Sequence, residues 1–178
     1  IQPVRYSFFW LGRNIERAEF SARLMRIALQ LLLNEREGIL EGSRILRALA
    51  ESGQIEPDLI VPGIKETLPV LTRSLPSSLF SDQLPMGFRS SLDHVIRLSA
   101  GLRDRLSTDS WRIINRMDSL CAQRPVSDMP DVADATELLD MLISIMSAFS
   151  GFVAENTTRT LGWRFLDLGR RIERAQQT

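Results

Sequence analysis

The sequence is poor in several residue types that common classes of site require. Its 178 residues include a single cysteine, Cys121, and a single histidine, His94. One cysteine cannot form an internal disulfide, which is typical of a protein of the reducing cytoplasm. The carboxylate metal sites of helical bundles use Glu-x-x-His motifs on facing helices, and His94 lies in no such motif. We therefore predict a cytoplasmic protein with no metal and no cofactor.

The chain also lacks an excess of either charge and any long apolar run. Its 22 basic residues balance 22 acidic ones, whereas nonspecific nucleic-acid binders usually have a clear basic excess. We predict no nucleic-acid partner. The longest apolar run, 141–154, is about 14 residues long, contains three serines and is too short to cross a bilayer. It is typical of a buried helix, and we predict no membrane partner.

What the sequence does contain is one phrase that is used twice. Residues 11–18 read LGRNIERA, and residues 168–175, which lie 157 positions later, read LGRRIERA. Seven of the eight positions are identical, and Phe8 and Phe165 extend the match. Apolar residues around the first copy recur at intervals of three and four, which is the spacing of a helix with one buried face. We predict two pseudo-symmetric helices lying side by side.

The charges of this phrase allow two interpretations. They could form an ion-pair lattice between packed helices, or the arginines could line a site for a carboxylate or phosphate while the glutamates orient them. Arginine suits both roles because its planar guanidinium group binds such anions through two hydrogen bonds. Both interpretations use the same candidates, which are Arg13, Glu16, Arg17, Arg170, Glu173 and Arg174.

Each copy of the phrase also contains a glycine, Gly12 in the first and Gly169 in the second. Glycine in a helix interior costs about 1 kcal/mol relative to alanine. Repeating that cost at both positions indicates a close approach by another backbone or by a ligand. We therefore predict that the two glycines are close-packing positions.

The rest of the chain reads as helix, except for one proline-rich stretch. Apolar spacing predicts helices near 6–34 and 43–52, and others that start near 90, 108, 130 and 163. The stretch 54–86 holds five of the eight prolines, which predicts irregular structure with short helical turns near 64–74. The predicted fold is an all-α, antiparallel bundle of about six helices. Residues 1–178 form one domain or the N-terminal part of a longer one.

Three segments, 10–19, 103–115 and 159–175, together resemble the alpha-E domain family, an all-helical bacterial domain with a repeated Glu-Arg motif. The resemblance extends over almost the whole chain. It adds Arg103, Asn115 and Arg159 as second-tier site candidates. Because similar domains continue past their second Glu-Arg helix, the resemblance implies that this chain is an N-terminal fragment.

The resemblance also implies a partner. Similar domains occur beside, or fused to, an ATP-grasp ligase-like domain, which implies peptide-modifying or amide-bond-forming chemistry. The sequence itself contains no glycine-rich phosphate loop and no candidate Ser-His-Asp triad. We therefore expect a helical accessory module that binds a partner, or a peptide or amino-acid ligand, and is not catalytic by itself. The alternatives are a ligand-binding or catalytic bundle with an Arg/Glu pocket, and a purely structural or dimerisation domain.

Overall fold

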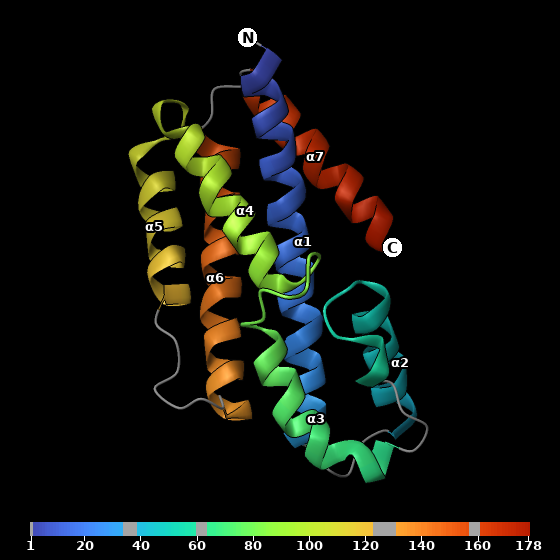
Figure 1. Ribbon diagram of the computed structural model, residues 1–178. Helices are drawn as coiled ribbons and strands as arrows, with labels where there is room; N and C mark the ends of the chain where they lie inside the picture. Colours follow the sequence, from blue (N-terminus) through green and yellow to red (C-terminus); the bar gives the residue numbers. More distant parts are fainter. Residues whose placement is uncertain (1, 34–38, 60–63, 123–130, 157–160) are drawn as a thin grey trace. The chain divides into compact units, whose positions relative to one another are not determined.

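The computed structural model describes residues 2–33, 39–59, 64–122, 131–156 and 161–178, and nearly all of them are helical (Figure 1). Two short 3-10 turns, Pro57–Leu59 and Arg103–Arg105, join the longer elements. No strand occurs in these ranges, which confirms the all-α prediction. The α-helices are α1 (Gln2–Leu33), α2 (Ile39–Glu51), α3 (Ile64–Ser78), α4 (Phe88–Gly101), α5 (Thr108–Ala122), α6 (Val132–Asn156) and α7 (Leu161–Gln177).

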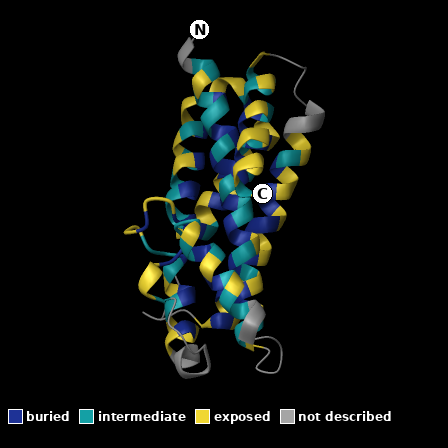
Figure 2. Cartoon of the chain, turned by 90° about the vertical axis from the view of Figure 1, so that its right-hand side faces the viewer, coloured by how far each residue is buried: buried dark blue, intermediate teal, exposed yellow. Residues whose placement is uncertain are grey.

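The chain divides into two compact units, and three of the helices contribute to both. Unit 1 contains Ile1–Glu19, Ser91–Gln123 and Leu142–Thr178. Unit 2 contains Phe20–Ser90 and Arg124–Met141. In each unit, buried and exposed residues alternate around the helices, as expected of amphipathic segments (Figure 2). In the part of the chain described above, no helix combines the length and apolar character that a membrane crossing requires.

Unit 1 is an up-and-down arrangement of helices. Following the chain, α1, α4, α5, α6 and α7 alternate in direction, so α1 and α7 run the same way (Figure 1). Leu11, Leu92, Ile114 and Phe149 are among its fully buried side chains. The predicted helix restart near residue 108 is confirmed: Ser107 Oγ accepts the backbone N–H of Ser110 at 3.1 Å, which satisfies a donor of the first turn of α5.

Unit 2 joins the second half of α1 to α2 and α3. Helix α2 contacts both α3 and the turn Pro57–Leu59. Gly53 follows the end of α2 with a φ of 71°, a conformation that glycine adopts without steric cost. Helix α2 thus ends close to the end of the helix predicted near 43–52, but it begins earlier, at Ile39. The core of this unit includes the fully buried side chains Leu29, Leu49, Ile55, Leu71 and Leu75.

The proline-rich stretch 54–86 is more regular than its composition indicates. It contains α3, a helix of 15 residues that extends beyond the short turns predicted near 64–74. Pro76 lies inside this helix, where it removes a backbone donor. Leu71, Leu75 and Leu79 recur at intervals of four and are buried, so apolar burial on one face offsets the cost of the proline. Helix α3 is the element that the predicted set of about six helices omits.

Candidate functional site: a reciprocal glutamate–arginine clasp

Helices α1 and α7 touch through the two glycines of the repeated phrase. A Cβ atom at Gly12 would lie 2.1 Å from the backbone oxygen of Leu166, and one at Gly169 would lie 2.1 Å from the backbone oxygen of Phe9. The two contacts are equivalent, because Leu166 and Phe9 occupy corresponding positions of the two copies. Only glycine permits backbones to approach this closely. The two helices are therefore parallel and related by a local pseudo-two-fold axis.

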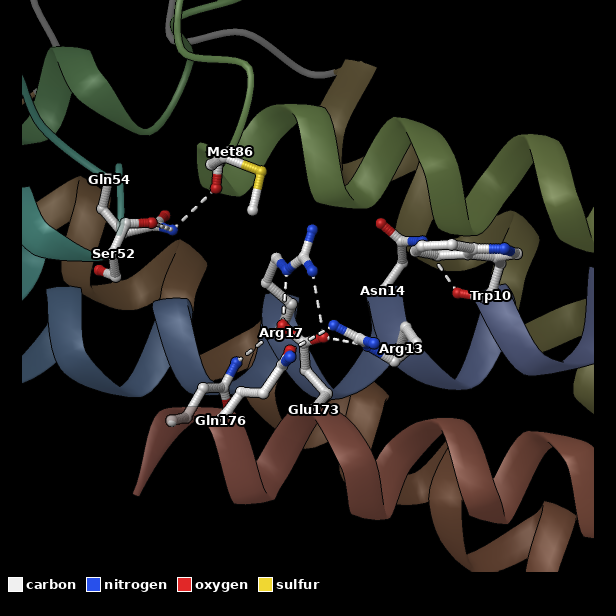
Figure 3. A network of polar contacts seen from close by, with 10 residues as sticks. Trp10, Arg13, Asn14, Arg17, Ser52, Gln54, Met86, Glu173 and Gln176 are labelled. Atoms are coloured by element: carbon white, nitrogen blue, oxygen red, sulfur yellow. Dashed lines mark hydrogen bonds and ion pairs between the residues drawn. The ribbon is translucent and has the colours of Figure 1, made fainter.

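One half of the polar contact is built on Glu173. Its carboxylate accepts hydrogen bonds from Arg13 Nε and from both Nε and Nη2 of Arg17, the latter two at 2.7 and 3.0 Å (Figure 3). Both arginines come from α1, and the side chain of Glu173 is only 5% exposed. Charge-assisted hydrogen bonds of this kind are stronger than neutral ones.

The other half reverses the roles of the two helices. Glu16 on α1 accepts Arg170 Nε at 3.0 Å on Oε2 and Arg174 Nε at 2.7 Å on Oε1. Its side chain is 10% exposed. Each helix thus supplies one buried carboxylate and the two arginines that hold the carboxylate of the other. We call these six side chains the clasp.

Further polar groups extend the clasp at its edges. Arg13 Nη2 donates to the amide oxygen of Gln176, and Arg170 Nη2 lies 3.8 Å from Glu19 Oε2. Four guanidinium groups therefore share three carboxylates. The arginines differ in exposure, because Arg13, Arg17 and Arg170 have side chains 13–19% exposed, whereas that of Arg174 is 64% exposed.

The electrostatics of the clasp keep Glu16 ionised. Burial alone raises the pKa of this carboxyl, but the hydrogen bonds and positive charges of Arg174 and Arg170 outweigh burial and hold the pKa below its usual value of 4.5. The same pair raises the pKa of Arg174, mainly through its hydrogen bond to Glu16. A general acid or base works best with a pKa near the operating pH. Glu16 is thus poorly suited to proton transfer near neutrality.

Aromatic rings support Arg13. Its guanidinium carbon lies 5.9 Å from the centre of the Phe9 ring and 5.6 Å from that of Trp10, both within cation–π range. These residues and Gln176 were absent from the predicted candidates. A signal was available for the aromatics, because residues three and four positions before Arg13 on a helix share its face.

The second-tier candidates lie on other elements. Arg103 belongs to the turn Arg103–Arg105, and its guanidinium carbon lies 5.3 Å from the centre of the Trp111 ring. Asn115 is exposed on α5. Arg159 lies outside the described residues. The structure thus brings the six main candidates together on α1 and α7, with Arg103 and Asn115 elsewhere in unit 1. Within the ranges that the structure describes, no three His, Cys, Asp or Glu side chains are grouped as a metal site requires.

The clasp is the structural counterpart of a known family signature. The model of the family called Alpha-E, described as a predicted alpha-helical domain with a conserved ER motif, matches residues 4–178. The chain belongs to the Alpha-E family. Its two Glu-Arg pairs, Glu16-Arg17 and Glu173-Arg174, both lie in the clasp.

Curated relatives of this Alpha-E chain are much longer than the chain itself. It is 25% identical over 184 residues to the uncharacterized protein Mb2597 of Mycobacterium bovis and, with the same figures, to the uncharacterized protein Rv2567 of Mycobacterium tuberculosis. Each alignment covers 96% of this chain but 21% of the relative. The chain therefore spans about a fifth of the relatives that it matches. No solved structure matches it.

Proposed function

We propose that this Alpha-E chain is a helical accessory module that works with an ATP-grasp-like ligase during peptide or amide-bond-forming modification. In this role it docks the ligase or holds the peptide or amino-acid acceptor, and the ligase carries out the chemistry. The ligase partnership rests on the resemblance of the repeated phrase and its flanking segments to alpha-E domains. The proposal places the module in the cytoplasm, where ATP is available and Cys121 stays reduced.

The observation that supports a non-catalytic role is the reciprocal pairing of the clasp. Glu16 and Glu173 are the buried carboxylates of the signature, and each is held by two arginines of the other helix. Carboxylates that are saturated in this way fasten helices together, and a lowered pKa withholds Glu16 from proton transfer near neutral pH. The signature thereby stabilises a scaffold and leaves other surfaces to contact partners.

The proportions of the relatives also support an accessory role. A segment that corresponds to a fifth of a longer protein is the size of one domain among several. Domains of that kind commonly present a substrate or a partner to a catalytic neighbour. The relatives are uncharacterised, so the activity of the whole protein is part of the same proposal.

The test is reconstitution of the chain with an ATP-grasp-like protein encoded in the same genome. ATP consumption and the formation of an amide product, detected by mass spectrometry, are measured for each protein alone and for the mixture. We expect no product from the chain alone and a marked increase when the chain is added to the ligase. Glu173→Gln should reduce that increase, and the surface change Asp167→Asn should not. Product formation by the chain alone, or no effect on the ligase, would reject the proposal.

One observation favours a second candidate, an anion-binding bundle. The clasp holds four guanidinium groups and two carboxylates, with the carboxylate of Glu19 at its edge, and Arg174 is largely exposed. A phosphate or carboxylate ligand could balance the extra positive charge. Thermal unfolding with increasing inorganic phosphate tests this, using Arg174→Gln and matched ionic strength as controls. A saturable rise in midpoint that Arg174→Gln removes supports the site, and a rise equal to that in sodium chloride excludes it.

A further inference from the structure

The pseudo-symmetry of α1 and α7 makes it possible to compare the two helices position by position. Adding 157 to a residue number in the first copy gives its counterpart in the second, and the glycine and clasp contacts obey this rule. Five apolar positions along one face of α1 have apolar counterparts on α7. The pairs are Val4 and Leu161, Phe8 and Phe165, Leu11 and Leu168, Ile15 and Ile172, and Ala18 and Ala175.

The two sets of apolar residues differ sharply in burial. On α1, Phe8 is 8% exposed, Ile15 is 2% exposed, and Leu11 and Ala18 are fully buried. On α7, the counterparts Leu168 and Ile172 are 45% and 36% exposed, and Leu161 is 52% exposed. Leu11 and Ile15 therefore lie in a core seam of α1, whereas their counterparts Leu168 and Ile172, in the same register, are exposed on α7. We call Leu161, Phe165, Leu168, Ile172 and Ala175 the α7 stripe.

The α7 stripe has the geometry of a helix-packing surface. Its residues recur at alternating intervals of four and three, which keeps them along one line of the helix. The buried residues of α7 are Leu166, Gly169 and Glu173, which lie on a different face, toward α1. Helix α7 thus buries its glycine face against α1, while the stripe stays exposed except at Phe165, which is half-buried. Contiguous exposed apolar residues of this kind mark interaction sites.

We propose that the α7 stripe is the docking surface for a further helical layer of the same, longer protein. This layer covers α7 as the helices of unit 1 cover the seam of α1. The complete module is then a pseudo-two-fold pair of bundles that meet at the clasp. The proposal concerns an interaction surface and is independent of the ligase partnership.

Two observations favour this occupant. The curated relatives have about four-fifths of their length outside the matched region, which is ample chain for another helical layer. The register supplies the second observation. The one position at which the repeated phrase differs is Asn14 in the first copy and Arg171 in the second, and it borders the seam of α1 and the stripe of α7.

That difference argues against an exchange of the helices that cover α1 between two copies of this chain. Asn14 is buried, and its amide donates to the Trp10 backbone oxygen at 2.8 Å. The helices that cover the seam of α1 therefore lie over a buried asparagine at this position. If two copies exchanged these helices, the helices of one copy would cover α7 of the other, where Arg171 stands in the place of Asn14. Burying the guanidinium group of Arg171 is costly without a carboxylate partner. Arg171 is paired with Asp167 at 2.7 Å, and its side chain is 74% exposed. The docking layer must therefore leave that guanidinium in solvent or supply a carboxylate.

Cysteine labelling tests the proposal in two contexts, the 178-residue chain and the full-length product of its gene. The test variant is Leu168→Cys, and the control is Arg116→Cys, at an exposed position of α5 outside the stripe. Cys121 is buried and serves in every sample as an internal reference for unfolding. The reagent is a maleimide, and labelled peptides are quantified by mass spectrometry over time.

In the 178-residue chain we expect both engineered cysteines to be labelled at similar rates. In the full-length product we expect Leu168→Cys to react at least about tenfold more slowly, because a covered thiol reacts only through local opening. Arg116→Cys should keep its rate. Equal labelling of Leu168→Cys in both contexts would overturn the proposal. So would protection of the 178-residue chain that grows with its concentration, because the occupant would then be a second copy.

Discussion

Replacing Glu173 by glutamine removes one carboxylate from the clasp while keeping its size. The carboxylate accepts hydrogen bonds from Arg13 and Arg17 and is 5% exposed. The amide keeps one acceptor but turns an NH2 donor toward guanidinium donors, so two partly buried cations lose their counterion. Breaking a buried ion pair by changing one partner costs about 3–5 kcal/mol. At about 2–4 °C per kcal/mol for a chain of this size, the unfolding midpoint should fall by roughly 6–20 °C.

The reciprocal change, Glu16→Gln, should cost less than Glu173→Gln. The arginines that hold Glu173 have side chains 13% and 17% exposed, whereas those that hold Glu16 are 19% and 64% exposed. Solvent screens the more exposed pair, so its loss is partly compensated by water. We expect the shift in midpoint for Glu16→Gln to lie toward the lower end of the range for Glu173→Gln.

The assay is thermal unfolding followed by circular dichroism and calorimetry at pH 7. Asp167→Asn is the matched control, because it makes the same chemical change on α7 in an exposed pair with Arg171. Exposed pairs four residues apart on a helix contribute about 0.3–0.5 kcal/mol, so the control should move the midpoint by roughly 1–2 °C. If Glu173→Gln shifts the midpoint no more than Asp167→Asn, or raises it, the clasp does not hold α1 to α7 and the anion-binding candidate gains support.

Three further predictions test other parts of the structure. Gly169→Ala should lose about 1–3 kcal/mol in urea unfolding because its Cβ meets the Phe9 carbonyl oxygen. Gly151→Ala, with nothing within 4 Å of its Cβ, should gain about 0.4–1 kcal/mol; a loss at both glycines, or at neither, would contradict the close approach. The lowered pKa of Glu16 stabilises the fold above the pKa of the unfolded chain, and this stabilisation is lost as the pH falls through the folded pKa, below 4.5. A plot of midpoint against pH from 7 to 3 should therefore fall less steeply for Glu16→Gln than for the parent. Cys121 should react with a maleimide only after unfolding, and rapid labelling of the native chain would place it at the surface.

Helical periodicity and the repeated phrase predicted most of the fold. The intervals of three and four that predicted a buried seam in 6–34 correspond to Leu11, Ile15 and Ala18, which are buried. Helix α3 was harder to predict, because local proline chemistry disfavours a helix that the burial of Leu71 and Leu75 then stabilises. The spacing of Leu71, Leu75 and Leu79 is a local helix signal, but the prolines of the same stretch outweighed it in the prediction.

The residues of the clasp were predicted from their repetition, and an ion-pair lattice between packed helices was one of the two interpretations, but which arginine holds which glutamate was not predicted. The sequence indicated that Glu16 and Glu173 need arginine partners, and the structure takes those partners from the opposite helix. Helices α1 and α7 are parallel because the helices of unit 1 alternate in direction along the chain. No single motif in the sequence encodes this alternation. Gln176 was not predicted because its contact depends on how α1 and α7 pack. Arg13 donates to Glu173 through Nε and to Gln176 through Nη2.

The sequence separation across the clasp has a kinetic consequence. Arg17 and Glu173 are 156 positions apart, and joining two points separated by that much unordered chain costs about 4–5 kcal/mol of loop entropy. Contacts of such high sequence separation form late in folding. Glu173→Gln should therefore leave the folding rate nearly unchanged and accelerate unfolding, which denaturant-jump kinetics can measure. The repeated Glu-Arg phrase then governs how long the folded chain persists rather than how quickly it forms.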